Sequence, residues 1–271
     1  MEPACDCLKT SHSLSDDERT YIYQHGDIRS VLAASRGHVA CLEHCTANGY
    51  AKHEWTSVYA ARNGHLACLD HCTRNGYPDH EVSSASAALN GHLACLEHCT
   101  LNGYTKHEET SQNAAYNGHL ACLDYCTRNE YPKHELTSYL AANGHLACLE
   151  HCTANGYPKH EFASCLAARN GHLACLEHCT ANGYPKPEWT SEYAARSGHW
   201  ECVLHCLERG YPFSDETQAE VDEYLLKQRE LTIVIMKFVY PRLHDQIYDV
   251  LEFYGIPRNV WPDIFTVVDN T

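Results

Sequence analysis

The sequence predicts an all-α, helix-turn-helix solenoid, and three observations lead to this fold class. A short phrase, Gly-His-Leu-Ala-Cys-Leu or a close variant, occurs seven times at spacings of 27, 27, 27, 26, 27 and 27 residues. A unit of this length holds two short helices and a turn but cannot bury a core alone, so neighbouring copies must stack. Apolar residues make up 44% of the chain, enough for a continuous core. The copies begin at Gly37, Gly64, Gly91, Gly118, Gly144, Gly171 and Gly198.

The copy at 171–197 shows how one repeat is expected to fold. Apolar or small residues recur at steps of three and four, which predicts a first helix over about 172–182 with one buried face. Gly183 occupies a position where a positive φ ends a helix, and Pro185 follows where it cannot prolong that helix. A second, shorter helix is expected over about 188–196.

The order of these features resembles the ankyrin repeat: Gly-His and an apolar helix, then Asn-Gly, then a short helix with Ala-Ala before the next Asn-Gly-His. The resemblance covers about 27–212 and implies a protein-binding solenoid. The usual repeat has about 33 residues, and the six missing here fall between Gly49 and Trp55, so the projecting finger loops are expected to be shortened. Compact copies of this kind are similar to ankyrin arrays abundant in amoebae and their giant viruses.

One copy departs from the period. The stretch 141–144 lacks one residue of the interhelix turn, and Glu130 stands where the other copies have the glycine that ends the first helix. A non-glycine side chain is strained at positive φ. We therefore expect a local change of stacking over 125–144 and no domain break.

The ends of the chain differ from the repeats. We expect an N-terminal tail over 1–13, an N-terminal capping repeat over 14–36, seven ankyrin-like repeats over 37–212 and a C-terminal helical cap over 213–271. Within the cap, a long helix is expected over 215–240, interrupted at Pro241 and followed by a last helix from Leu243 to Tyr254.

Charge and hydropathy exclude several classes of partner. Against 20 Lys and Arg stand 35 Asp and Glu, a formal charge of −15 that repels phosphate backbones and anionic lipid. The N-terminal residues lack the layout of a signal peptide, and no apolar run approaches the ~20 residues of a spanning helix. We therefore expect no nucleic acid, no membrane and a cytoplasmic location, which would be the host cytoplasm for a viral protein.

Seventeen cysteines are present, and fourteen of them are two per repeat, four residues apart. Cysteines at this spacing on one helix have poorly directed side chains for a disulfide, and the cytosol is reducing. They are expected to be reduced thiols that fill core positions.

Histidine recurs in three columns of the repeat, each with a structural and a metal-binding interpretation. The ankyrin resemblance implies that the first column caps the helix start and hydrogen-bonds backbone. The second column shares a helix with both cysteines, so zinc bound between neighbouring repeats is an alternative. Stacked helices lie ~8–10 Å apart, which makes it difficult for four ligands from two repeats to reach one ion. The third column is expected in an exposed turn. The columns are His38, His65, His92, His119, His145, His172, His199; His44, His71, His98, His151, His178, His205; and His53, His80, His107, His134, His160.

No residue set predicts catalysis, a cofactor or a resident metal. A Cys-His pair can form a nucleophile and its base, but seven identical pairs would mean seven active sites. No unique third group and no Gly-rich phosphate loop accompany them.

Partner specificity is expected at positions that vary between copies, since fixed positions serve stacking. By the ankyrin comparison, the second helix lines the concave side, and the variable position at its start includes aromatic residues that commonly anchor partners. The alternative is that these side chains only cover the core of their own repeat. The predicted partner-binding residues are Trp55, Val82, Glu109, Leu136, Phe162 and Trp189.

Two narrower roles are alternatives. An apolar helical stripe from Pro241 to Tyr254 with prolines after it resembles the boxes by which some ankyrin proteins join ubiquitin-ligase scaffolds, although such a stripe is more often a capping helix. The chain could also be a structural component of a viral particle. The partner protein itself is not identified by the sequence.

Overall fold

The computed structural model describes the backbone of residues 28–243 and the side chains of residues 28–231. The chain divides into two compact units, Met1–Tyr211 and Pro212–Thr271. Within residues 28–243 the secondary structure is helical, with no strand. The expected tail over 1–13, and the start of the expected capping repeat, lie outside the described residues.

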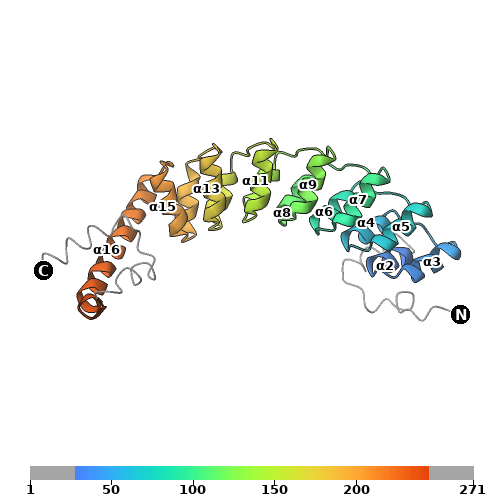
Figure 1. Ribbon diagram of the computed structural model, residues 1–271, viewed down its shortest axis with the longest axis horizontal. Coiled ribbons are helices and arrows are strands. Elements are labelled where there is room, and N and C mark those ends of the chain that lie inside the picture. The colour runs from blue at the N-terminus through green and yellow to red at the C-terminus, as the bar shows by residue number, and fades with distance from the viewer. Residues whose placement is uncertain (1–27, 244–271) are drawn as a thin grey trace. The chain divides into compact units, whose positions relative to one another are not determined.

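The first unit alternates shorter and longer helices in two rows, which we call the inner and outer rows. The array curves, and α4, α6 and α8 lie on the inner side of the curve (Figure 1). The inner row is α2 (Arg29–Ser35), α4 (Trp55–Arg62), α6 (Ser83–Leu89), α8 (Thr110–Tyr116), α10 (Thr137–Ala141), α12 (Ala163–Arg169) and α14 (Trp189–Arg196). The outer row is α3 (Val39–Ala47), α5 (Leu66–Arg74), α7 (Leu93–Leu101), α9 (Leu120–Arg128), α11 (Leu146–Ala154), α13 (Leu173–Ala181) and α15 (Trp200–Glu208).

The prediction for the copy at 171–197 is confirmed, since α13 and α14 begin and end within one residue of the expected bounds. The connections from each outer helix to the next inner helix have seven or eight residues and contain no strand, so the finger loops are short, as expected.

A ladder of fully buried side chains forms the core of the first unit. Each outer helix contributes one large apolar residue, and most inner helices contribute a buried Ala-Ala pair that lets neighbouring inner helices approach closely. The ladder is Leu42, Leu69, Leu96, Leu123, Leu149, Leu176 and Val203. The core is therefore continuous from repeat to repeat.

The interhelix turn requires glycine because the next repeat lies against it. Gly91 has a φ of +74°, and a Cβ added there would lie 2.6 Å from Nδ1 of His119 in the following repeat. At the other turn of the repeat, Gly103 has a φ of +75° but open space around it. Both glycines therefore meet the need for a positive φ, but only Gly91 is also required by close packing.

This close approach corrects the expected role of the first histidine column. His65 precedes α5 but forms no side-chain cap bond to that helix. Its ring instead lies against Gly37 of the preceding repeat, and Nε2 is 3.1 Å from the carbonyl oxygen of Ser35. The expected bond to backbone is present, but it joins two repeats because the stacking distance brings the ring onto the neighbouring turn.

We predict that Gly91→Ala destabilises the protein more than Gly103→Ala does. Gly103→Ala incurs only the cost of the left-handed backbone, about 1–2 kcal/mol, whereas Gly91→Ala also forces the His119 ring away. Urea unfolding followed by circular dichroism gives both losses. Equal losses would show that the histidine ring moves aside freely.

The repeat with the missing residue is locally different, as expected. Its inner helix α10 has five residues, against seven in α8 and α12. Glu130 has a φ of 57° and is the one non-glycine residue at positive φ in the part of the chain that the structure describes. Gly144, in the turn after α10, has a φ of 97°.

We predict that Glu130→Gly raises the free energy of unfolding by up to about 1 kcal/mol. The substitution relieves the left-handed strain, and the greater freedom of glycine in the unfolded chain offsets part of this gain. Glu130→Ala is the control, because it removes the carboxylate and keeps the strain. A glycine variant no more stable than the alanine variant contradicts the prediction.

In the second unit, α16 runs from Asp215 to Leu243. The Ser214 hydroxyl accepts a hydrogen bond from the Thr217 amide at 3.2 Å, which caps the helix start. The interruption expected at Pro241 is wrong: a proline removes one amide bond from a helix without necessarily ending it. The last expected helix, Leu243 to Tyr254, lies outside the described residues. Of the described helices, none combines the length and apolar character needed to cross a membrane.

Candidate functional site

The second histidine column belongs to a polar node that joins neighbouring outer helices. The Thr46 hydroxyl donates to the Leu42 carbonyl oxygen at 2.9 Å. His71 Nε2 lies 2.8 Å and the Tyr77 hydroxyl 2.9 Å from the same Thr46 oxygen, and both come from the next repeat. The Thr46 hydroxyl has one hydrogen, and it is donated to the Leu42 carbonyl oxygen. The hydroxyl oxygen can therefore only accept from the histidine and the tyrosine, so both of these side chains are donors.

The node determines the protonation of its histidine. Nδ1 of His71 faces the side-chain amide of Asn75 at 3.2 Å, and an amide nitrogen can only donate. His71 is therefore neutral with its proton on Nε2. Burial lowers the pKa of this histidine below its usual value, and the nearby carboxylates Glu43 and Asp70 offset only part of that shift.

The same node recurs along the array with one exception. Thr100 bonds Tyr131 at 3.0 Å, and Tyr125 replaces the histidine there. Burial is likewise the main cause that lowers the pKa of His98, His151, His178 and His205. The histidine–threonine distances are 2.8–2.9 Å for Thr73–His98, Thr127–His151, Thr153–His178 and Thr180–His205.

We predict that the array loses stability as the pH falls below about 6.5. The folded pKa values of these histidines lie below the unfolded value, so the unfolded chain binds more protons in this window and the free energy of unfolding decreases. The loss is absent above the unfolded pKa and is complete below the folded one. Urea unfolding at pH 7.5 and pH 5.5 measures it.

His178→Gln is the matched variant, because glutamine keeps an N–H donor for Thr153 without titrating. It is expected to reduce the difference between the two pH values. If the variant retains the full pH dependence of the original chain, the node does not cause it.

The third histidine column precedes the inner helices and accepts the amide hydrogen of the residue at each helix start, a role that the expected exposed turn did not include. Nδ1 of His160 accepts the amide hydrogen of Phe162 at 3.2 Å, and the histidine is only partly exposed. The equivalent bonds are 3.1–3.3 Å for Trp55–His53, Val82–His80, Glu109–His107 and Leu136–His134. The histidine therefore positions the backbone of the variable residue two places later.

Lysines in the shortened finger turns form a further link between repeats that the sequence did not reveal. The Lys159 ammonium donates to the Asn182 carbonyl oxygen at 2.6 Å, at the C-terminal end of the next outer helix. It also lies 5.8 Å from the centre of the Tyr184 ring. A cation at a helix C-terminus is favourable, and the recurrence of lysine two residues after the tyrosine was the signal. The other bonds are Lys52–Asn75, Lys106–Asn129, Lys133–Asn155 and Lys186–Arg209.

The repeated cysteines have the chemistry of core residues. Burial raises the pKa of Cys68 to about 11 and that of Cys72 to about 12, so both are protonated near neutral pH. The cysteines of the described residues are buried thiols. In the same part of the chain, no three His, Cys, Asp or Glu side chains are grouped to hold a metal ion.

The six predicted binding residues fall at the starts of the inner helices but differ in exposure. Glu109, Phe162 and Trp189 are exposed, whereas Val82 and Leu136 are half-buried. Trp55 packs against the buried cluster of Ile28, Val31 and Leu32 and lies 4.6 Å from the His80 ring. Trp55 therefore fits the alternative interpretation, in which the side chain covers the core and does not anchor a partner.

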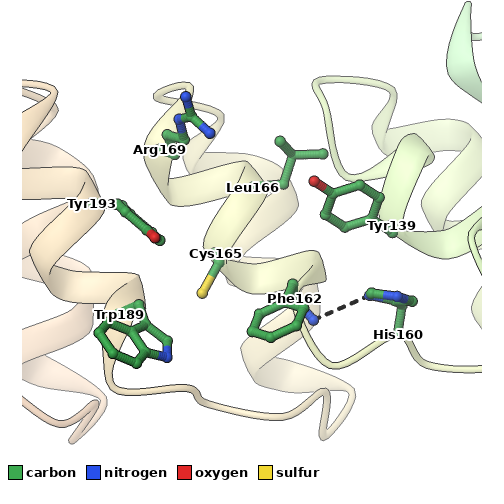
Figure 2. A pocket seen from close by; sticks show the side chains of 8 residues that line it. All are labelled: Tyr139, His160, Phe162, Cys165, Leu166, Arg169, Trp189 and Tyr193. Atoms are coloured by element: carbon green, nitrogen blue, oxygen red, sulfur yellow. Dashed lines mark hydrogen bonds between the residues drawn. The ribbon is translucent and has the colours of Figure 1, made fainter.

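Phe162 and Trp189 lie in a groove of about 480 Å³ on the inner row. Figure 2 shows Trp189 and Tyr193 of α14 on one side and Phe162 and Tyr139 on the other. Cys165 is buried and directs its sulfur toward the space between Phe162 and Trp189. The full lining is Tyr139, His160, Phe162, Cys165, Leu166, Arg169, Trp189 and Tyr193.

Sequence reasoning missed Tyr139 and Tyr193 as parts of this site. They lie three and four residues after the variable positions 136 and 189, which places them on the same helix face. That spacing was the available signal. Of the predicted set, the groove unites only Phe162 and Trp189.

Comparison with known proteins bears on the fold. No protein-family model and no curated protein matches the chain. Among solved structures, the ankyrin repeat domain of human ASB11 matches with a TM-score of 0.56. The fold is an ankyrin-repeat solenoid. The match covers 65% of this chain and 96% of the ASB11 domain at 19% identity, so it shows the ankyrin fold and not a shared partner.

Proposed function

We propose that the protein binds another protein through the groove on its inner row and acts without catalysis. One observation carries the proposal: Phe162, Trp189 and Tyr193 leave 40%, 46% and 38% of their surface exposed beside one another. Large aromatic side chains gathered in a groove are the usual anchors of protein interfaces. The array has a complete core without them.

The division between fixed and variable positions supports this function. The node threonines, their histidines and the buried leucines recur because each repeat meets a similar neighbour. The groove residues other than His160 vary from copy to copy, so stacking does not demand them. Protonated, buried cysteines and reduced thiols agree with a non-catalytic protein of the cytoplasm.

The test is capture of partners from the cell of origin by the full chain and by the double variant Phe162→Ala/Trp189→Ala. The double variant is expected to lose most of the bound partner, since truncating a buried anchor commonly weakens binding tenfold or more. Leu101→Ala is the control, because Leu101 is 82% exposed on the outer row. Retention of every partner by the folded double variant overturns the proposal.

The narrower roles stay predictions. The segment that resembles a ubiquitin-ligase box extends beyond Leu243 and so lies mostly outside the described residues. A ligase substrate receptor would lose ligase subunits when the chain ends at Pro212, whereas a structural component of a viral particle, of giant viruses in particular, would be present there in stoichiometric amounts.

A further inference from the structure

We propose that Asn143 is a site of spontaneous deamidation, at which the backbone nitrogen of Gly144 attacks the Asn143 side chain and converts the asparagine to aspartate or isoaspartate. The inference concerns the shortened repeat and does not depend on the groove. It comes from a comparison within the chain, because the sequence contains ten Asn-Gly pairs and the structure holds this one differently from the others.

Asn-Gly is the reactive form of asparagine, because glycine has no Cβ to obstruct the approach of its backbone nitrogen to the preceding side chain. The Gly144 nitrogen gives its proton to hydroxide and bonds to Cγ of Asn143, and the Cγ–Nδ2 bond breaks with release of ammonia. Water then opens the resulting cyclic imide at either carbonyl. The reaction consumes one water and releases one ammonia, and nothing is oxidised or reduced.

In the other nine pairs, hydrogen bonds restrain both reacting groups. The glycine amide donates to the carbonyl oxygen three residues earlier at 3.2–3.4 Å, as Gly171 does to Ala168. The asparagine Nδ2 also donates within the protein, as Asn117 does to the Leu89 carbonyl oxygen at 2.6 Å. These nine asparagines are Asn48, Asn63, Asn75, Asn90, Asn102, Asn117, Asn155, Asn170 and Asn182.

The missing residue removes the backbone restraint at Asn143-Gly144. Ala142 is the C-cap of α10, and the Asn143 amide donates to the Leu140 carbonyl oxygen at 3.2 Å, which is the bond that glycine makes in the regular turns. In the described part of the chain, the Gly144 amide makes no bond of that kind. Burial raises the pKa of the Cys175 thiol, and a hydrogen bond from the Gly144 backbone lowers it in part. The acceptor of this amide is therefore a thiol, which is a weak one.

The Asn143 side chain is bonded through its oxygen. The Asn170 Nδ2 donates to the Asn143 Oδ1 at 2.6 Å, whereas the Asn143 Nδ2 has no hydrogen bond within the described residues. A donor at this oxygen draws electrons from Cγ and stabilises the negative charge that develops on the oxygen during the attack. Asn143 is half-buried and Gly144 is exposed, so water can reach the site.

The products change the turn between α10 and α11 without cleaving the chain. Aspartate at position 143 adds a negative charge and keeps an acceptor oxygen for Asn170. Isoaspartate also inserts one carbon into the main chain of the turn that lacks a residue. The modification therefore acts at the irregular repeat and leaves the regular repeats as they are.

The test incubates the intact protein in water enriched in heavy oxygen at mildly alkaline pH, digests it at acidic pH and measures the deamidated fraction of each asparagine by mass spectrometry. Asn143 is expected to react about tenfold or more faster than any of the other nine, since in those pairs two hydrogen bonds must break before attack. The chain unfolded in urea is the control and should lose this preference. Equal rates in the folded protein, or a preference that persists in urea, overturn the inference.

Two variants test the cause. An arginine inserted between Ala142 and Asn143 restores the Ala-Ala-Arg-Asn-Gly order of the next repeat, and the rate at this asparagine should fall to that of the other pairs. Asn170→Ala removes the donor at Oδ1 and should slow the reaction severalfold. Circular dichroism checks that both variants fold. An insertion variant that reacts as fast as the original chain overturns the role of the shortened turn, and an unchanged rate in Asn170→Ala overturns that of the donor.

Discussion

The structure depends on one threonine hydroxyl per repeat. Thr46 satisfies its own helix carbonyl and two side chains of the next repeat, so its single proton and both lone pairs are used. A solenoid has only nearest-neighbour contacts, and a saturated polar node fixes the orientation of one repeat on the next more sharply than apolar packing does. The separation of Phe162 and Trp189 is set by this stacking, because the two residues belong to different repeats.

The two rows of the array perform different tasks. The outer row carries the threonine nodes and the fully buried leucines, and both stabilise the stack. The inner row buries its Ala-Ala pairs and leaves the starts of its helices accessible. The histidine that precedes an inner helix belongs to the fixed framework, yet it bonds the amide of the residue that varies, as His160 does for Phe162. Variation is therefore possible at that position without loss of the stack.

The period and the helix punctuation were sufficient to predict the fold and the helix bounds of the repeat at 171–197, because both depend on local residues such as Gly183 and Pro185. The threonine node could not be predicted in this way. His71 and Tyr77 lie 25 and 31 residues after Thr46 in the sequence and reach it only when the repeats stack. The exposure of individual side chains could not be predicted from the sequence either. Trp55 and Trp189 occupy the same position of their repeats, but Trp55 packs on Ile28 and Leu32, whereas Trp189 is exposed in the groove.

The groove lies next to the irregular repeat, which contributes one of its lining residues, Tyr139. The one-residue deletion leaves α10 two residues shorter than α12, so α10 ends at Ala141 while α12 continues through its last turn. Leu166 and Arg169 lie in the second half of α12, and both line the groove together with Tyr139 of α10. Most of the lining comes from the repeats of α12 and α14, which keep the regular helix lengths, and the shortened repeat contributes Tyr139. The positive φ of Glu130 belongs to that same shortened repeat.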